Sequence, residues 1–226
     1  MSVLVLAEVD GDNLKPSCYQ AVTAAASWGL PIDLLVYGNN LDAAVAEAQK
    51  ISGLRTVLRA QAAHFQHPLV EDVSDLVLAI ASDYQVILSA HSVFGKSVLP
   101  GVAARLDVAA ITDVITINAP SDYVRPAYAG NILSHIHSDD AVQVVSVRGT
   151  AFQLAGRNGN APVVNVDVPA SRAVSRWMRE QLNHSERPEL NSARVVIAGG
   201  RSLGEQFESL LNPLAEKLDA AVGATR

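Results

Sequence analysis

Cysteine is almost absent from this sequence of 226 residues, in which Cys18 is the single example. One cysteine excludes an intrachain disulfide framework, and it also excludes a metal site built from several thiolates. A chain without disulfides is typical of a reducing compartment. We therefore expect a cytoplasmic protein.

The sequence also lacks an excess of basic residues. Lys and Arg total 17 against 23 Asp and Glu, which gives a net charge of -6 at pH 7. This balance argues against a nucleic-acid partner, because binding through phosphates needs a basic surface. No apolar run is long enough to span a bilayer, so we expect no direct membrane insertion. The start of the chain, Val3–Val9, is typical of a strand rather than of a signal or transit peptide.

Motifs of catalysis are missing as well. Ser92 follows His91, and Asp113 comes later, but Ser92 has no Gly-x-Ser-x-Gly elbow around it, so a hydrolase triad is not indicated. His135 and His137 alternate along a predicted strand and so share one face, yet no third ligand accompanies them. We predict no catalytic residue and no metal site.

A glycine-rich phosphate loop is absent after the first predicted strand. Asp10-Gly11-Asp12 follows that strand, and its two carboxylates have the wrong sign for a phosphate. The loop from His91 to Lys96 has two interpretations. It is either a plain helix cap or a contact for a nucleotide or a partner, because loops at the carboxyl ends of parallel strands often form sites.

The first half of the sequence does contain a regular alternation of apolar strand patterns and amphipathic helix patterns. This alternation favours right-handed crossovers and therefore a mainly parallel, doubly wound α/β sheet. The predicted strands are Val3–Val9, Ile32–Tyr37, Leu54–Leu58, Val86–Ser89 and Val108–Ile115. The predicted helices are Ser17–Trp28, Leu41–Ile51, Leu69–Ser82 and Phe94–Leu106.

The pattern changes after Ile117. Three β-rich runs, Tyr123–Tyr128, Ile132–His137 and Val142–Val147, are joined by short polar or glycine-containing segments. This arrangement predicts an antiparallel meander appended to the parallel sheet. Val163–Val168 is a further candidate strand.

The end of the sequence has a strand, a glycine turn and a helix in succession. Val195–Ala198 is an apolar β-branched run, Gly199-Gly200-Arg201 follows, and a helix pattern extends from Gly204 to Leu218. Such a turn is a place where backbone N–H groups meet a phosphate, with Arg201 as an added donor. This motif is a weaker indication of phosphate binding than Gly-x-Gly-x-x-Gly, and similar turns occur in parallel sheets that bind no ligand. A second apolar run, Ala220–Gly223, begins another strand.

Changes in composition and the positions of turn-forming residues divide the chain into three parts. Residues 1–169 form the predicted N-terminal α/β domain, and residues 170–192 form a polar linker. Residues 193–226 form the incomplete start of a second domain, since a parallel sheet cannot close on so few strands.

Several stretches, in order along the whole chain, match one family. In these stretches the chain resembles the α subunit of electron-transfer flavoproteins. The matching stretches are Val5–Glu8, His91–Pro100, Arg125–Asn131, Val147–Phe152, Ser185–Leu190, Gly199–Arg201 and Val222–Arg226.

The resemblance implies an adenine-nucleotide-hydrolase-like first domain and a Rossmann-like, FAD-binding second domain. It implies a heterodimer with a β subunit that carries single electrons from dehydrogenases, including those of fatty-acid β-oxidation, to a quinone oxidoreductase or similar acceptor. Such a protein is a carrier and has no substrate turnover of its own.

The resemblance also implies three FAD-binding residues. Arg201 matches an arginine near the FAD phosphate and ribityl region, Thr225 matches a Ser or Thr that contacts the cofactor, and Arg226 matches an arginine over the flavin ring. The family continues beyond Arg226, so we expect a subunit truncated within its FAD domain, with weak or no FAD binding. Without a transit peptide, we expect a bacterial origin.

Two other hypotheses remain. A stand-alone nucleotide-binding or regulatory module without flavin would need a phosphate loop near the first or fourth strand. A catalytic dehydrogenase truncated in its cofactor domain would need an acid–base constellation, and none is apparent in the sequence.

Overall fold

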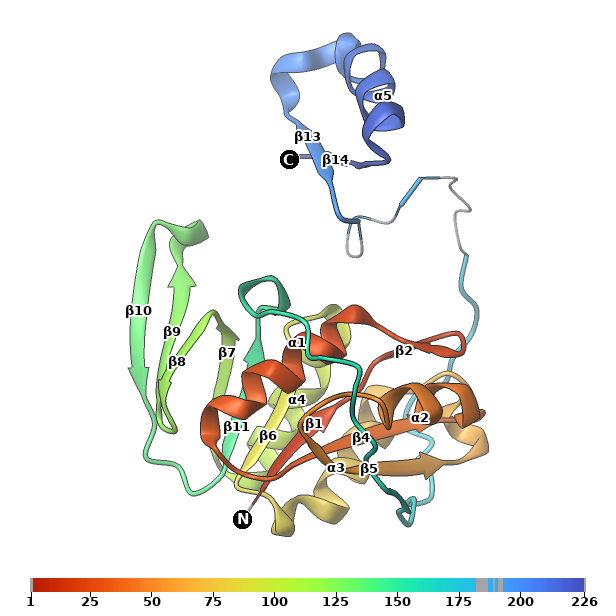
Figure 1. Ribbon diagram of the computed structural model, residues 1–226, viewed down its shortest axis with the longest axis vertical. Helices are drawn as coiled ribbons and strands as arrows, with labels where there is room; N and C mark the ends of the chain where they lie inside the picture. The colour runs from red at the N-terminus through yellow and green to blue at the C-terminus, as the bar shows by residue number, and fades with distance from the viewer. Residues whose placement is uncertain (1, 182–186, 189, 191–192, 226) are drawn as a thin grey trace. The chain divides into compact units, whose positions relative to one another are not determined.

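The computed structural model describes residues 2–181, 187–188, 190 and 193–225. Residue contacts divide the chain into two units, Met1–Trp177 and Met178–Arg226. Figure 1 shows the elements of both units. Among the described residues, no helix combines the length and the apolar composition that crossing a bilayer requires.

A seven-stranded parallel sheet forms the centre of the first unit, which confirms the predicted α/β fold. Its strands follow the order β12-β5-β4-β1-β6-β11-β7, and every neighbouring pair is parallel. The strands are β1 (Val3–Leu6), β4 (Ile32–Gly38), β5 (Leu54–Gln61), β6 (Val86–Ala90), β7 (Ala110–Val114), β11 (Gln143–Val147) and β12 (Val163–Asn165).

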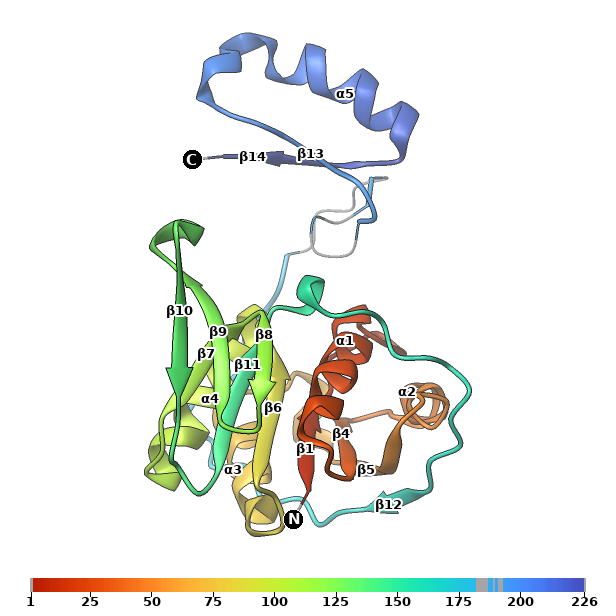
Figure 2. The ribbon, with the colours of Figure 1, turned by 60° about the vertical axis from the view of Figure 1, so that its left-hand side comes forward.

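Helices cover both faces of this sheet, as a doubly wound fold requires. Val3 and Val5 of β1 pack in a core with α1 (Pro16–Ala25) and α2 (Asp42–Ala48). Leu4 and Leu6 pack in the opposite core with α3 (Val70–Ile80) and α4 (Val93–Leu106). Helices lie on both faces of the sheet (Figure 2), and successive side chains of β1 enter two different cores.

The first predicted strand ends earlier than expected. β1 stops at Leu6, and Val9 belongs to a short hairpin in which β2 (Val9–Asp10) pairs with β3 (Asn13–Leu14). Gly11 adopts a φ of 57° in the turn between them. This turn reverses the chain before α1, where Pro16 occupies the first turn of the helix.

The predicted antiparallel meander is partly wrong. β9 (Asp122–Ala127) and β10 (Ile132–His137) do form the expected hairpin, but their third strand is β8 (Thr116–Ala119). The run Val142–Val147 instead supplies β11, which lies in the parallel sheet between β6 and β7. All five residues of β11 are buried, as a strand covered on both faces requires.

The segment that follows β12 lies along α3. Ser171 donates its hydroxyl to the buried Asp72 over 2.9 Å, and the backbone N–H of Arg172 donates to the same carboxylate over 3.2 Å. Trp177 stacks on His67 with ring centroids 3.9 Å apart. These contacts tie the segment to the first unit as far as Trp177.

The second unit contains one strand–helix–strand motif. β13 (Val196–Gly199) and β14 (Ala221–Ala224) pair in parallel, and α5 (Phe207–Leu218) connects them. The predicted helix began at Gly204, but this glycine has φ 50° and ψ −129° and interrupts the helix. α5 therefore begins at Phe207, after the short 3₁₀ segment η6 (Arg201–Gln206).

Asp33 connects three elements of the first unit. Its side chain on β4 is 3% exposed and accepts hydrogen bonds from Arg55 Nε (2.9 Å) and the Tyr84 hydroxyl (2.8 Å). Burial, followed by the hydrogen bond to Asp33, raises the pKa of Tyr84 well above its usual range. The tyrosine therefore remains a hydrogen-bond donor.

Replacing Asp33 is expected to destabilise the first unit. Asp33→Ala leaves the Tyr84 hydroxyl without its acceptor and should lower the free energy of unfolding by about 2–3 kcal/mol in chemical denaturation. The matched control is Asp42→Ala, because Asp42 also pairs with an arginine, Arg59, but its side chain is 79% exposed. We expect it to cost below about 1 kcal/mol. Equal losses from the two variants would contradict this role of Asp33.

Candidate functional site

Two of the three predicted FAD-binding residues lie side by side in the second unit. β13 and β14 are parallel with Gly199 opposite Ala224, and the N–H of Thr225 donates to the carbonyl of Gly199 over 2.9 Å. Arg201 lies just beyond the carboxyl end of β13, and Thr225 lies just beyond the carboxyl end of β14. Both residues are exposed. Arg226 lies outside the described residues.

Close packing explains the glycines of this turn. A Cβ atom on Gly199 would lie 2.6 Å from Leu203 and 2.9 Å from Phe207, and one on Gly200 would lie 3.0 Å from the hydroxyl oxygen of Thr225. Without side chains, Gly199 allows η6 and α5 to approach the strand. Gly200 leaves room at the Thr225 hydroxyl.

This edge of the second unit could hold a phosphate-bearing cofactor. Ligands of open parallel sheets bind beyond the carboxyl ends of the strands, where Arg201 and Thr225 lie. Arg201 offers a planar set of N–H donors that suits a phosphate, and Thr225 offers a hydroxyl. Since α5 begins only at Phe207, Arg201 rather than the helix N-terminus supplies the positive charge.

In the first unit, the carboxyl edge of the main sheet holds a carboxylate of the chain itself. Glu8, after β1, is nearly buried and accepts a hydrogen bond from the Ser92 hydroxyl. Ser92 also caps α4, because its Oγ accepts from the N–H of Gly95 over 2.9 Å. Lys15 Nζ lies 3.5 Å from the other carboxylate oxygen of Glu8. A negative charge thus occupies the N-terminus of α4.

This arrangement decides between the two interpretations of the loop from His91 to Lys96, of which one is a helix cap. The structure confirms a cap, formed by Ser92. Any phosphate brought to the same helix end would meet the Glu8 carboxylate and its charge. The geometry therefore disfavours nucleotide binding through this helix terminus.

The structure separates Ser92 from His91 and Asp113. His91 Nδ1 lies 2.8 Å from Ser146 Oγ, whereas the Ser92 hydroxyl is directed to Glu8. Asp113 accepts two hydrogen bonds from Arg148, at 2.9 and 2.6 Å, and its Oδ1 lies 3.9 Å from His91 Nε2. His91, Asp113, Ser146 and Arg148 thus form a polar cluster, which contains the Asp113–Arg148 ion pair and joins the ends of β6, β7 and β11.

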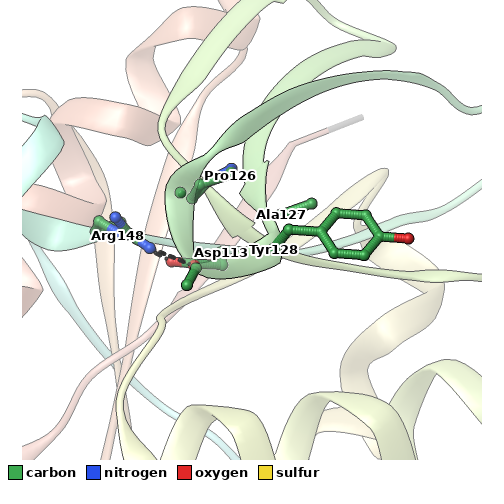
Figure 3. Close-up of a pocket in the computed structure, with 7 residues that line it drawn as sticks. Asp113, Pro126, Ala127, Tyr128 and Arg148 are labelled. Atoms are coloured by element: carbon green, nitrogen blue, oxygen red, sulfur yellow. Dashed lines mark hydrogen bonds and ion pairs between the residues drawn. The ribbon is translucent and has the colours of Figure 1, made fainter.

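A pocket of about 380 Å³ adjoins this cluster, and the sequence did not reveal it. The Asp113–Arg148 pair and the turn from Pro126 to Gly130 line it (Figure 3). Tyr128 and Ala129 adopt φ values of 50° and 56°, a left-handed conformation that is unusual for residues other than glycine. The Tyr128 ring points away from the Asp113–Arg148 pair in the close-up.

His137, one of the two alternating histidines, is bound by carboxylates. Its Nδ1 lies 2.6 Å from Asp122 and its Nε2 3.0 Å from Asp139. These hydrogen bonds, that to Asp122 first, raise the pKa of His137. Both ring nitrogens then act as donors, which disfavours metal binding by this side chain.

Comparisons with known proteins point to one family. The family model named electron transfer flavoprotein domain matches residues 3–171. The chain is 39% identical to the electron transfer flavoprotein subunit alpha of Pseudomonas aeruginosa, over 100% of this chain and 74% of that protein. It is 40% identical to the subunit alpha of Bradyrhizobium diazoefficiens, over 100% of this chain and 73% of that protein. The probable mitochondrial subunit alpha of Caenorhabditis elegans is 36% identical, with coverage of 100% and 69%.

The partial burial of His91 predicts a pH-dependent stability. Burial lowers the pKa of His91 below 6.5, and the Asp113 carboxylate only partly opposes this effect, while Lys96 and Arg148 add to it. Above pH 6.5 the imidazole is neutral in both states. Below that value the unfolded chain binds the proton first, so the histidine destabilises the fold as the pH falls.

We therefore compare the wild-type chain with His91→Gln in thermal unfolding between pH 8 and pH 5. The wild type should lose stability relative to the variant as the pH falls below about 6.5. His135→Gln, at an exposed histidine, is the control and should follow the wild type. A stability difference between wild type and His91→Gln that stays constant over this range would refute the expectation.

Proposed function

We propose that this chain, which belongs to the electron transfer flavoprotein subunit alpha family, carries single electrons through an FAD held at the carboxyl edge of β13 and β14. The observation that carries the proposal is the parallel register of these strands, which brings Arg201 and Thr225 to one edge. The matches over the whole chain support the flavoprotein function itself.

The residues of that edge have distinct roles in the proposal. Arg201 would bind the phosphate and ribityl region of FAD, and Thr225 would donate or accept a hydrogen bond through its hydroxyl. Arg226, which lies outside the described residues, would place a permanent positive charge near the flavin ring. When bound, FAD supplies the redox chemistry, and the protein residues bind and orient it.

We further propose the context in which the chain works. It pairs with a β subunit, accepts electrons from dehydrogenases such as those of fatty-acid β-oxidation, and passes them to a quinone oxidoreductase or similar acceptor in a bacterial cytoplasm. It makes no product of its own. Residues 1–169 form the first domain, 170–192 the linker and 193–226 the beginning of the FAD-binding domain.

Arg201 provides the first test of this function. In the complex of the chain with the β subunit, Arg201→Ala should raise the Kd for FAD about tenfold or more, because a charge-assisted hydrogen bond is lost. Fluorescence titration with free FAD measures weak binding as well as tight binding. Arg179→Ala, at an exposed arginine of the same unit, is the matched control and should leave the Kd unchanged. Equal effects of the two variants would remove Arg201 from the site.

Arg226 is tested by the reduction potential rather than by affinity. A fixed positive charge near the ring stabilises added negative charge, so Arg226→Ala should lower the potential of the first electron by roughly 60 mV or more, a tenfold change in a one-electron equilibrium. Spectroelectrochemistry of the complex measures this potential. Arg226→Lys should retain most of it, since the charge remains. An unchanged potential in the alanine variant would exclude Arg226 from this role.

A further inference from the structure

The segment that precedes β13 lies outside the proposed FAD edge but contacts the motif that forms this edge. It belongs to the second unit, and the structure describes Arg187, Pro188 and Leu190 of it. Arg187 contacts the helix of the motif, and Leu190 lies over one of its strands. The segment therefore meets the strand–helix–strand motif at two separate places.

Arg187 contacts α5 through both terminal nitrogens of its guanidinium group. Its Nη1 donates to Asn212 Oδ1 over 2.8 Å, and its Nη2 lies 3.7 Å from Glu216 Oε1. Asn212 and Glu216 are four positions apart, so both side chains lie on one face of the helix. The Arg187 side chain is only 35% exposed, as expected for an arginine that lies along the helix rather than extending into solvent.

The two contacts of Arg187 span a weak point of α5. Pro213 lies inside the helix, between Asn212 and Glu216. A proline at such a position has no N–H for the helical hydrogen bonds, and its ring clashes with the preceding turn, so it destabilises or kinks the helix. A side chain that binds residues on both sides of Pro213 opposes this distortion. Arg187 therefore supports the helix where its own backbone supports it least.

Leu190 lies on the face of the β13–β14 pair that is opposite to α5. A Cβ atom on Gly223 would lie 3.3 Å from Leu190 Cδ2 and 3.8 Å from the Cβ of Ala198. A Cβ atom on Gly199 would instead lie 2.6–2.9 Å from side chains of η6 and α5. Because Ala198 and Gly199 are neighbours in β13, they face opposite sides of the strand pair. The pair is thus held between α5 and Leu190.

Both contacts of the segment lead to a proposed FAD ligand within two residues of a strand. Gly223, which lies under Leu190, is two residues before Thr225. Gly199, on which α5 packs, is two residues before Arg201. A segment that contacts α5 and β14 at the same time therefore limits how far Arg201 and Thr225 can move apart.

We infer that Arg187 is a positioning residue of the FAD site and acts through Arg201 and Thr225. It ties the segment that carries Leu190 to α5, and this tie keeps the two strand ends side by side, so that one phosphate-bearing flavin nucleotide reaches both ligands. The inference rests on the proposed function, which supplies the cofactor. Without Arg187 both ligands are present, but their alignment is lost.

The first test needs no cofactor. The Thr225 N–H donates to the Gly199 carbonyl, so its hydrogen exchange reports the pairing of the strand ends. In the complex with the β subunit, Arg187→Ala should accelerate exchange in the peptide that contains Thr225 about tenfold, as measured by mass spectrometry, because a hydrogen bond from a charged group is lost. Arg187→Lys, which keeps a charged donor, should restore most of the protection. Arg194→Ala, at an exposed arginine of the same unit, is the control and should match the wild type. Unchanged exchange in Arg187→Ala would overturn the inference.

The second test separates positioning from general folding by means of FAD affinity. Fluorescence titration gives the Kd for FAD of the wild-type complex, of Arg187→Ala, of Thr225→Val and of the double variant. Arg187→Ala should raise the Kd about fivefold in the wild-type background but by less than about twofold in Thr225→Val, because one of the two ligands that it aligns is then missing. A residue that only stabilised the fold would raise the Kd by the same factor in both backgrounds.

The outcomes distinguish the inference from the proposed function. If Thr225→Val raises the Kd and Arg187→Ala does not, the inference is wrong, although the FAD site stands. Equal factors in the two backgrounds also overturn the inference, since Arg187 then acts on folding alone. If the wild type does not bind FAD, or if neither Thr225→Val nor Arg201→Ala changes the Kd, the proposed site fails and the inference fails with it.

Discussion

Parallel pairing of strands is the constraint on which both units depend. Parallel neighbours need a crossover, and the helices that provide it must cover the sheet, so β1, β4 and β6 are buried on both faces. The same pairing brings every strand-to-helix turn to one edge. The side chains that could bind ligands or partners gather there for a topological reason, before any specific chemistry is considered.

The carboxyl edge of the parallel sheet differs between the two units in the charges that it carries. In the first unit, the Glu8 carboxylate lies at the N-terminus of α4, and Asp113 pairs with Arg148. Charged groups of this edge are therefore compensated within the chain itself. In the second unit, Arg201 is exposed and glycines leave the backbone accessible. The first edge is therefore stabilised by internal ion pairs and hydrogen bonds, whereas the second has an exposed positive charge, as the proposed FAD site requires. This contrast favours placing the cofactor in the second unit.

Local sequence patterns predicted most of the helices and strands, but not always which strands pair with one another. The apolar run at Ile32–Tyr37 and the stop at Gly29, which adopts a left-handed φ of 63°, are local features, and both are confirmed. The run at Val142–Val147 was recognised as a strand, but its insertion between β6 and β7 depends on residues far away in the sequence. The pocket beside Tyr128 depends on the strained turn and on Arg148 together, so neither segment indicated it alone. The adjacency of Arg201 and Thr225 likewise required the register of β13 and β14.

That register also links the cofactor site to the stability of the second unit. Two parallel strands and one helix bury little apolar surface, and Leu210, Leu214 and Leu218 of α5 remain exposed. A ligand that contacts both Arg201 and Thr225 would bind only when β13 and β14 are paired. Binding would therefore favour the paired state by mass action, to an extent set by ligand concentration relative to Kd. If FAD binds at this edge as proposed, folding of the unit and cofactor binding are coupled equilibria, and substitutions that weaken the packing of α5 on β13 should also weaken FAD binding.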